Sequence, residues 1–226
     1  MMIFCGVSKA QSAEPTDPKA TEDWSRRPTI VQSLKTSSDI PSDAIILLIQ
    51  DQVNWIKKDG TPTEWTFEKG VLTVKPGSGD IISKASVEDC HLHLEWRSPL
   101  IVKGEGQGRC NSGIFLQSRY EIQILDNYNN DTYYNGQAGA VYKQHPPLAN
   151  ACAKTGDWNT YDIIYKAPVF DLNGYKVSAG YVTVIHNGIV IQNNTEIVGT
   201  TEYIGFPKQV LHGGAPFILQ DHGDLV

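Results

Sequence analysis

Apolar and polar residues alternate with a period of two along most of this chain, and this pattern limits the folds open to it. In the segment CHLHLEWR (90–97), every second residue is apolar. Successive side chains of a β-strand point to opposite faces, so such a segment buries one face and leaves the other polar. No sustained helical stripe follows the first residues of the chain. The pattern therefore predicts an all-β protein.

About a dozen short segments have this character, and connectors rich in Gly, Asn and Pro separate them. The pair Asn187-Gly188 is typical of a two-residue hairpin turn. Many short strands with frequent turns predict a jelly-roll β-sandwich of two antiparallel sheets. The expected strands are 44–49, 64–68, 71–75, 80–84, 87–97, 112–117, 120–125, 138–142, 160–166, 181–186, 189–192 and 216–220.

The first 40 residues differ from the rest. Residues 1–13 join a short apolar stretch to small residues, as at the end of a secretory signal peptide. The basic start of such a signal is missing, so an unstructured tail is the alternative. Residues 14–40 are expected to be a flexible leader, and 41–226 the folded domain. A signal remnant predicts a periplasmic or secreted protein.

Charge and cysteine content exclude several classes of function. The 226 residues carry 19 Lys and Arg against 25 Asp and Glu, a net charge of −6, without a basic cluster. Nucleic acids and anionic membranes are therefore poor partners, and no run of 18 apolar residues could cross a bilayer. The four cysteines contain no CxxC pair and allow three disulfide pairings, which the sequence does not distinguish: Cys5, Cys90, Cys110 and Cys152.

Two expected strands carry chemically active side chains on their polar faces. His91 and His93 share a face with Glu95 and Arg97, which suits either a solvated surface or a ligand-binding row. Two histidines two residues apart also leave a divalent metal as an alternative. In the segment YEIQILD (120–126), Glu121 and Gln123 point away from the apolar face, and a bulge would bring Asp126 beside them. Acid–base catalysis and pairing with a neighbouring arginine are both open.

Aromatic residues in the connectors suggest carbohydrate contacts. Sugars place their C–H faces on such rings, and their hydroxyl groups bond to nearby amides and carboxylates. We expect Tyr142 and Trp158 to contact substrate in this way. The alternative is that these rings cap the ends of the sandwich.

Five segments in a fixed order give the chain a family resemblance: NSGIFL (111–116), YEIQILD (120–126), GQAGAVY (136–142), WNTYDII (158–164) and LQDHG (219–223). Together they resemble the bacterial 3-keto-disaccharide hydrolase domain family over residues 41–226. The resemblance implies a concanavalin A-like jelly roll, in agreement with the strand pattern. Relatives continue through one more strand after the DHG motif, so we expect the last strand to be missing here.

The resemblance also implies a reaction. A separate dehydrogenase oxidises C3 of a glycoside or disaccharide to a ketone, which acidifies the hydrogen at C2. A base removes this hydrogen, the C1–O bond breaks by elimination, and water adds to the 2-hydroxyglucal. Glu121, Asp126 or His222 would serve as base or acid, and Arg97 and Lys84 would stabilise the enolate. Further substrate-binding residues implied are His93, Glu95, Asn111, Ser112, Gln123, Gln137, Gln220 and Asp221.

Two other functions fit the same fold. Glu121-Ile-Gln123-Ile-Leu-Asp126 is similar to the E-x-D-x-x-E signature of jelly-roll glucanases, although Gln123 cannot titrate. A conventional glycosidase is therefore one alternative, and a lectin-like binding module is the other. No cofactor is required by the sequence; His91, His93, Glu95 and His222 leave a divalent metal open.

Overall fold

The computed structural model describes residues 19, 22–23, 25, 27–28, 30–31, 40–49 and 52–223. Contacts divide the chain into two units, Met1–Ile45 and Ile46–Val226, and the second contains the strands. The predicted signal remnant, 1–13, lies outside the described residues, and so does most of the predicted leader, 14–40. The fold below is that of the second unit.

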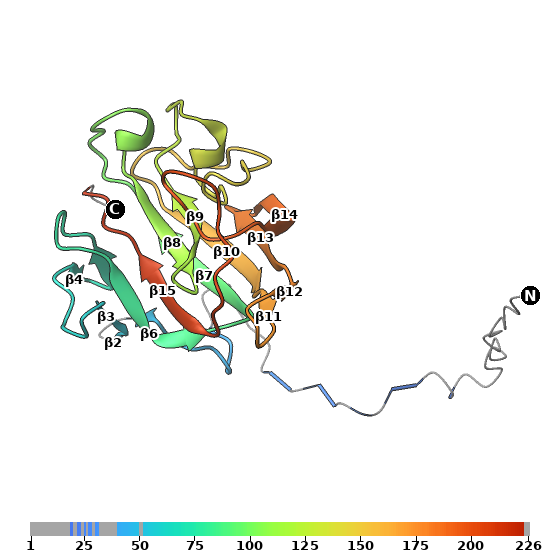
Figure 1. Ribbon diagram of the computed structural model, residues 1–226. Helices are drawn as coiled ribbons and strands as arrows, with labels where there is room; N and C mark the ends of the chain where they lie inside the picture. Colours follow the sequence, from blue (N-terminus) through green and yellow to red (C-terminus); the bar gives the residue numbers. More distant parts are fainter. Residues whose placement is uncertain are drawn as a thin grey trace, which may run out of the picture. The chain divides into compact units, whose positions relative to one another are not determined.

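Two antiparallel sheets form the body of this unit (Figure 1). The four-stranded sheet has the order β14-β13-β10-β7, with β7 at Cys90–Trp96, β10 at Asn159–Lys166, β13 at Gly180–His186 and β14 at Ile189–Ile197. The five-stranded sheet has the order β3-β6-β15-β8-β9. Its strands are β3 (Trp55–Lys57), β6 (Ile81–Val87), β8 (Ser112–Leu116), β9 (Tyr120–Ile124) and β15 (Ala215–Leu219).

Short elements lie outside the two sheets. Three two-stranded ribbons pair β1 (Leu48–Ile49) with β2 (Gln52–Val53), β4 (Thr66–Glu68) with β5 (Val71–Thr73), and β11 (Val169–Phe170) with β12 (Lys176–Ser178). Two 3-10 turns, η2 (Gly106–Gly108) and η3 (Tyr134–Gly136), interrupt the long connectors. Among the described residues, no helix is long and apolar enough to cross a membrane.

The core lies between the two sheets and follows the predicted alternation. Ile114 and Ile122 of the five-stranded sheet and Ile163 and Val184 of the four-stranded sheet are fully buried in one apolar cluster. Burial of each such side chain contributes roughly 1.5–3 kcal/mol of transfer free energy. Both sheets therefore bury one face and turn the other outward, which confirms the predicted jelly-roll sandwich.

The expected strand at 138–142 forms only isolated bridges. Val141 is bridged to Ile122 on one side and to His145 on the other. The segment nevertheless runs along the outer edge of β9, because the N–H of Tyr142 donates to the carbonyl of Glu121 at 3.1 Å. Pairing of this kind covers an edge that would otherwise expose unpaired backbone groups. It also decides which side chains lie beside Glu121.

The hairpin predicted at Asn187-Gly188 is confirmed. It joins β13 to β14, and both turn residues have positive φ, 51° at Asn187 and 79° at Gly188. This is the combination that a type I′ turn requires.

Candidate active site

Strand β9 keeps its polar side chains buried on the outer face of the five-stranded sheet. Glu121 is 3% exposed and Gln123 is fully buried, although both alternate with the core residue Ile122. The edge segment 138–142 and the loop after β14 supply the cover, since the N–H of Glu121 also donates to Thr201 Oγ1 at 2.9 Å. The predicted outward direction is confirmed, but the face is enclosed and not solvated.

Glu121 pairs with Phe115 of β8 on one side and lies opposite Tyr142 on the outer edge. Because Ile122 and Val141 are bridged, Glu121 and Tyr142 are the next directly opposed pair, and directly opposed residues share a face. Tyr142 is 8% exposed, and its hydroxyl lies 2.6 Å from the hydroxyl of Tyr133. The site thus joins a buried carboxyl group to a pair of hydrogen-bonded phenols.

Burial raises the pKa of Glu121 to about 8, and the negative charge of Asp80 adds to this effect. Asp80 lies at the start of β6 and is itself paired with Lys58 at 3.1 Å. A carboxyl group with such a pKa exchanges its proton near neutral pH, which is what a general base or acid needs.

The carboxamide of Gln123 contacts the carboxyl group of Glu121. One end of this group lies 3.0 Å from Glu121 Oε1 and 2.9 Å from the carbonyl oxygen of Ser112. With its nitrogen at that end, the amide donates to both oxygens and stabilises an ionised Glu121. With its oxygen there, the amide would face the carbonyl oxygen of Ser112 with no hydrogen atom between the two, so the first orientation fits the surroundings.

A chain of amides extends the site towards the two 3-10 turns. The other end of the Gln123 carboxamide lies 3.1 Å from Gln107 Oε1, and Asn111 Nδ2 donates to the carbonyl of Gln107 at 2.8 Å. Gln107 Nε2 in turn donates to the carbonyl of Gly136. Gln137, half-buried, follows directly. Gln107 was missed in the sequence because its Gly-rich connector, GEGQGR, has no periodic pattern.

Gln220 and Asp221 lie where β15 ends, beside the start of β6. The N–H of Gln220 donates to the carbonyl of Gly113, and the buried Oε1 of Gln220 accepts no hydrogen bond from the described residues. Asp221 accepts from the N–H of Gly79 at 2.8 Å. Partial burial acts to raise the pKa of Asp221. The N–H of Gly79 and other backbone donors outweigh this effect and hold the pKa below its usual value. Asp221 thus anchors a loop, and His222 is exposed beyond it.

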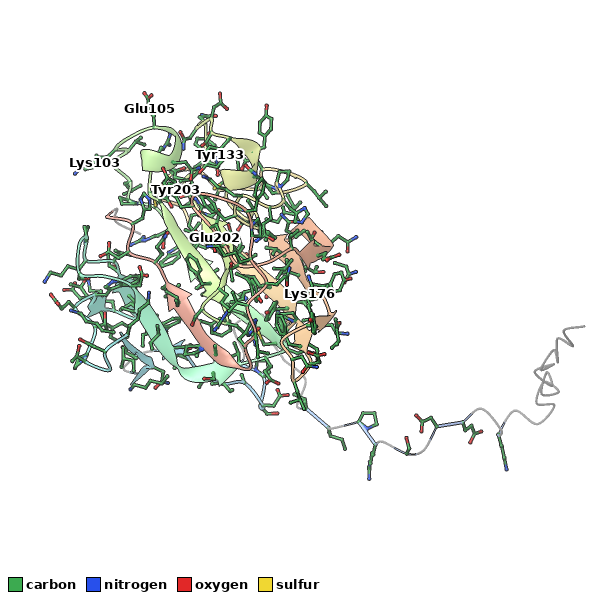
Figure 2. The ribbon with its side chains drawn as sticks, viewed as in Figure 1. Lys103, Glu105, Tyr133, Lys176, Glu202 and Tyr203 are labelled. Atoms are coloured by element: carbon green, nitrogen blue, oxygen red, sulfur yellow. The ribbon has the colours of Figure 1, made fainter. Side chains whose placement is uncertain are left out.

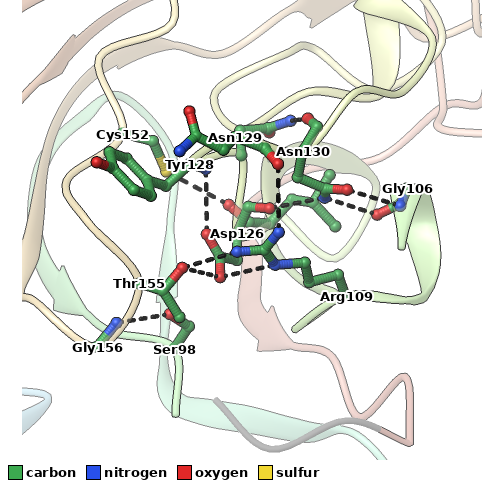
Figure 3. Close-up of polar contacts among 12 residues, drawn as sticks. Ser98, Gly106, Arg109, Asp126, Tyr128, Asn129, Asn130, Cys152, Thr155 and Gly156 are labelled. Carbon is green, nitrogen blue, oxygen red and sulfur yellow. Dashed lines mark hydrogen bonds and ion pairs between the residues drawn. The ribbon is translucent and has the colours of Figure 1, made fainter. Parts of the chain in front are cut away.

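Asp126 is held in a structural ion pair, which disagrees with its predicted role as base or acid (Figure 3). Arg109 Nε lies 3.0 Å from Asp126 Oδ2, and both side chains are largely buried. Thr155 Oγ1 donates to the same oxygen at 2.8 Å, and the N–H of Tyr128 donates to Oδ1 at 3.1 Å. Both carboxylate oxygens are occupied, and loss of the negative charge would leave a buried cation unpaired.

The polar row on β7 lies on the opposite side of the molecule from Glu121. His93, Glu95 and Arg97 are exposed on the outer face of the four-stranded sheet, while Trp96 points into the core. Arg97 stacks over the ring of Trp158 at 4.9 Å. The whole core separates these residues from Glu121, so the single groove expected from the sequence is corrected to two faces.

The two histidines of this row contact a carboxylate. His91 Nε2 and His93 Nδ1 lie 3.1 and 2.9 Å from the same oxygen, Oδ1 of Asp162 on β10. Within the described ranges, no group of three or more His, Cys, Asp or Glu side chains is arranged to hold a metal ion. Cys90 and Cys152 are free thiols, and Cys5 lies outside the described residues.

Lys84 and Ser112 both lie on the five-stranded sheet. Lys84 is exposed on β6 and alternates with the buried Ser83, so it lies on the same outer face of the sheet as Glu121. Ser112 Oγ donates to the carbonyl of Gln220 at 2.8 Å and so links β8 to β15. Figure 2 shows Tyr133 and Tyr203 towards the top of the view. The rings of both residues contact the Lys143 ammonium group.

Comparisons with known proteins bear on the family and the fold. The family model of the 3-keto-alpha-glucoside-1,2-lyase-like domain matches residues 50–226. A crystal structure of a "putative glycosyl hydrolase" from Parabacteroides distasonis is 47% identical, with a TM-score of 0.86, and the match covers 92% of this chain and 90% of that one. A second structure so described, from the same organism, is 17% identical with a TM-score of 0.53 over 76% of this chain and 84% of that one, which shows the fold alone. No curated protein sequence matches the chain.

Proposed function

Because this chain belongs to the 3-keto-alpha-glucoside-1,2-lyase-like domain family, we propose that it cleaves 3-keto-glycosides by elimination. The ketone at C3 makes the hydrogen at C2 acidic, so removal of this hydrogen leaves an enolate. Its electrons form the C1–C2 double bond as the C1–O bond breaks. Addition of water to the resulting 2-hydroxyglucal gives 3-ketoglucose, so that the net change is hydrolysis.

Glu121 is the base in this proposal, and its enclosed position is the observation that carries it. A carboxyl group whose pKa is raised to about 8 by burial is a stronger base, once ionised, than one in water. Since the side chain is only 3% exposed, the groups that cover it must move when a sugar enters.

The other roles go to residues on or near the outer face of the five-stranded sheet, where Glu121 lies. Lys84 is the predicted cation that shares the outer face with Glu121, and we keep it as the group that stabilises the enolate. Asn111, Gln123, Gln137, Gln220 and Tyr142 supply donors and acceptors for sugar hydroxyl groups. A separate dehydrogenase that oxidises C3 would supply the substrate, and an exported location remains part of the proposal.

The test compares 4-nitrophenyl 3-keto-glucoside with 4-nitrophenyl glucoside. We expect release of nitrophenol from the keto sugar alone. Glu121→Gln should lower the rate by about 10²–10⁴-fold, the range for loss of a general base. The control Glu68→Gln, on the exposed β4–β5 ribbon, should keep the full rate.

Two outcomes would replace the proposal. Cleavage of the unoxidised glucoside at a comparable rate would indicate a conventional glycosidase. Binding of glycans without release of product from any 3-keto sugar would indicate a lectin-like module.

A further inference from the structure

We propose that the hydroxyl group of Tyr142 donates the proton to the departing glycosidic oxygen. This inference rests on the proposed function and assigns its missing acid. The sequence indicated only that Tyr142 contacts sugar. The structure places Tyr142 directly across the β9 edge from Glu121.

Backbone pairing fixes this placement. The N–H of Tyr142 donates to the carbonyl of Glu121 at 3.1 Å, and the neighbouring pair Ile122 and Val141 is bridged and buried. In an antiparallel pair the Cβ atoms of opposed residues lie about 5 Å apart and project to the same side. C2 and the C1 oxygen of one glycoside are separated by two bonds, so a base and an acid that act on them must be neighbours.

The phenol is held in one orientation by its surroundings. Its hydroxyl lies 2.6 Å from that of Tyr133, which supplies a second donor in contact with the first. The Lys143 ammonium group lies 5.8 Å from the ring centres of both tyrosines and donates to the carbonyl of Tyr203 at 2.6 Å. Lys143 has a φ of 56°, a left-handed conformation that is uncommon for a residue with a side chain. This position holds a cation near the rings of both tyrosines.

The protonation state of Tyr142 fits an acid for an alcohol. Burial, followed by the hydrogen bond with Tyr133, raises the pKa of Tyr142 well above its ordinary value, so the group stays protonated throughout the working range. An alkoxide that leaves a sugar is more basic still and takes this proton readily. A nitrophenolate is a weak base and can leave without help.

The proton balance closes without any other reactant. Glu121 takes the C2 hydrogen as a proton, and the C–H electrons become the C1–C2 double bond. The C1–O electrons leave with the oxygen, which takes the proton of Tyr142 and departs as the alcohol. The tyrosinate then recovers a proton from the protonated Glu121, through Tyr133 or water. Both residues return to their starting states.

The decisive experiment is a leaving-group series of 3-keto-glucosides, from 4-nitrophenyl to methyl, assayed with Tyr142→Phe. We expect a loss of about 100-fold or more on the methyl glycoside and less than about fivefold on the nitrophenyl glycoside. Tyr134→Phe is the matched control, because this ring is 76% exposed in the neighbouring turn η3. It should match the wild type on both substrates.

A second readout separates this role from others. Tyr142→Phe should still exchange the C2 hydrogen of the methyl 3-keto-glucoside with deuterium from D₂O, because Glu121 is intact. An equal loss on both leaving groups, or loss of exchange, would overturn the acid role. Failure of the wild type to cleave any 3-keto-glycoside would refute the proposed function itself. Retained exchange in Tyr142→Phe also shows that the variant is folded.

Discussion

Glu121 and Tyr142 oppose each other across the edge of β9, joined by a 3.1 Å hydrogen bond between their backbones. This relationship gives the sandwich a carboxyl group and a phenol on one enclosed face. The two residues are distant in sequence. They meet because the 138–142 segment follows the outer edge of the sheet.

The activity should depend on pH through Glu121. Because a base must be ionised to act, kcat/KM for the 4-nitrophenyl 3-keto-glucoside should rise with pH and level off above about pH 8. A pH profile of the wild type checks this. A rate that is already maximal at about pH 5 would show that the base has an ordinary carboxylate pKa.

Stability should depend on the same group in the opposite sense. The pKa of Glu121 rises from 4.5 to about 8 on folding, so the folded state holds its proton more tightly. The stability that this proton contributes is complete below pH 4.5 and is lost as the pH rises through about 8. Glu121→Gln should therefore be more stable than the wild type at about pH 9, by on the order of a few kcal/mol. Denaturant unfolding of the wild type and Glu121→Gln at about pH 4.5 and about pH 9 measures this difference in stability. If the two proteins differed by the same amount at both pH values, the burial of Glu121 would be contradicted.

Asp126 should matter for folding and not for chemistry. Removing one partner of a buried ion pair leaves the other charge uncompensated, so Asp126→Ala should lower the free energy of unfolding by about 3–5 kcal/mol. The double variant Asp126→Leu with Arg109→Met should recover much of this loss, because no charge is left unpaired. A large loss of kcat in a variant of unchanged stability would return Asp126 to the catalytic groups.

The outer face of the four-stranded sheet should not affect the chemical step. Arg97→Ala and His93→Ala remove exposed groups that the core separates from Glu121. Exposed substitutions of this kind usually change stability by less than about 0.5 kcal/mol. We expect kcat/KM on a small aryl 3-keto-glucoside to stay within about twofold of the wild type. A tenfold loss in a folded variant would show that both faces take part.

Local patterns predicted the direction of single side chains well and their long-range partners poorly. The alternation in 90–97 and 120–124 correctly separated core residues such as Trp96 and Ile122 from outward ones. It could not show that β7 and β9 belong to different sheets, since strand pairing is set by contacts between distant segments.

The sequence pattern also did not predict that the outward face of β9 is buried. Glu121 is enclosed because Thr201, 80 residues later, and the 138–142 segment cover it. The partner of Asp126 is Arg109, in a Gly-rich connector without periodicity. Segment 138–142 has the composition of a strand but forms only bridges, because it contacts an edge of the sheet and turns back at His145.

The fate of the C2 hydrogen tests the central claim most directly. A 3-keto-glucoside that carries deuterium at C2 is treated with the wild-type protein in ordinary water, and the mass of the sugar product is measured at early times. Elimination through Glu121 predicts that the product has lost the deuterium and that cleavage is slower than with the unlabelled substrate. A product that keeps deuterium at C2, formed at an unchanged rate, would contradict the account.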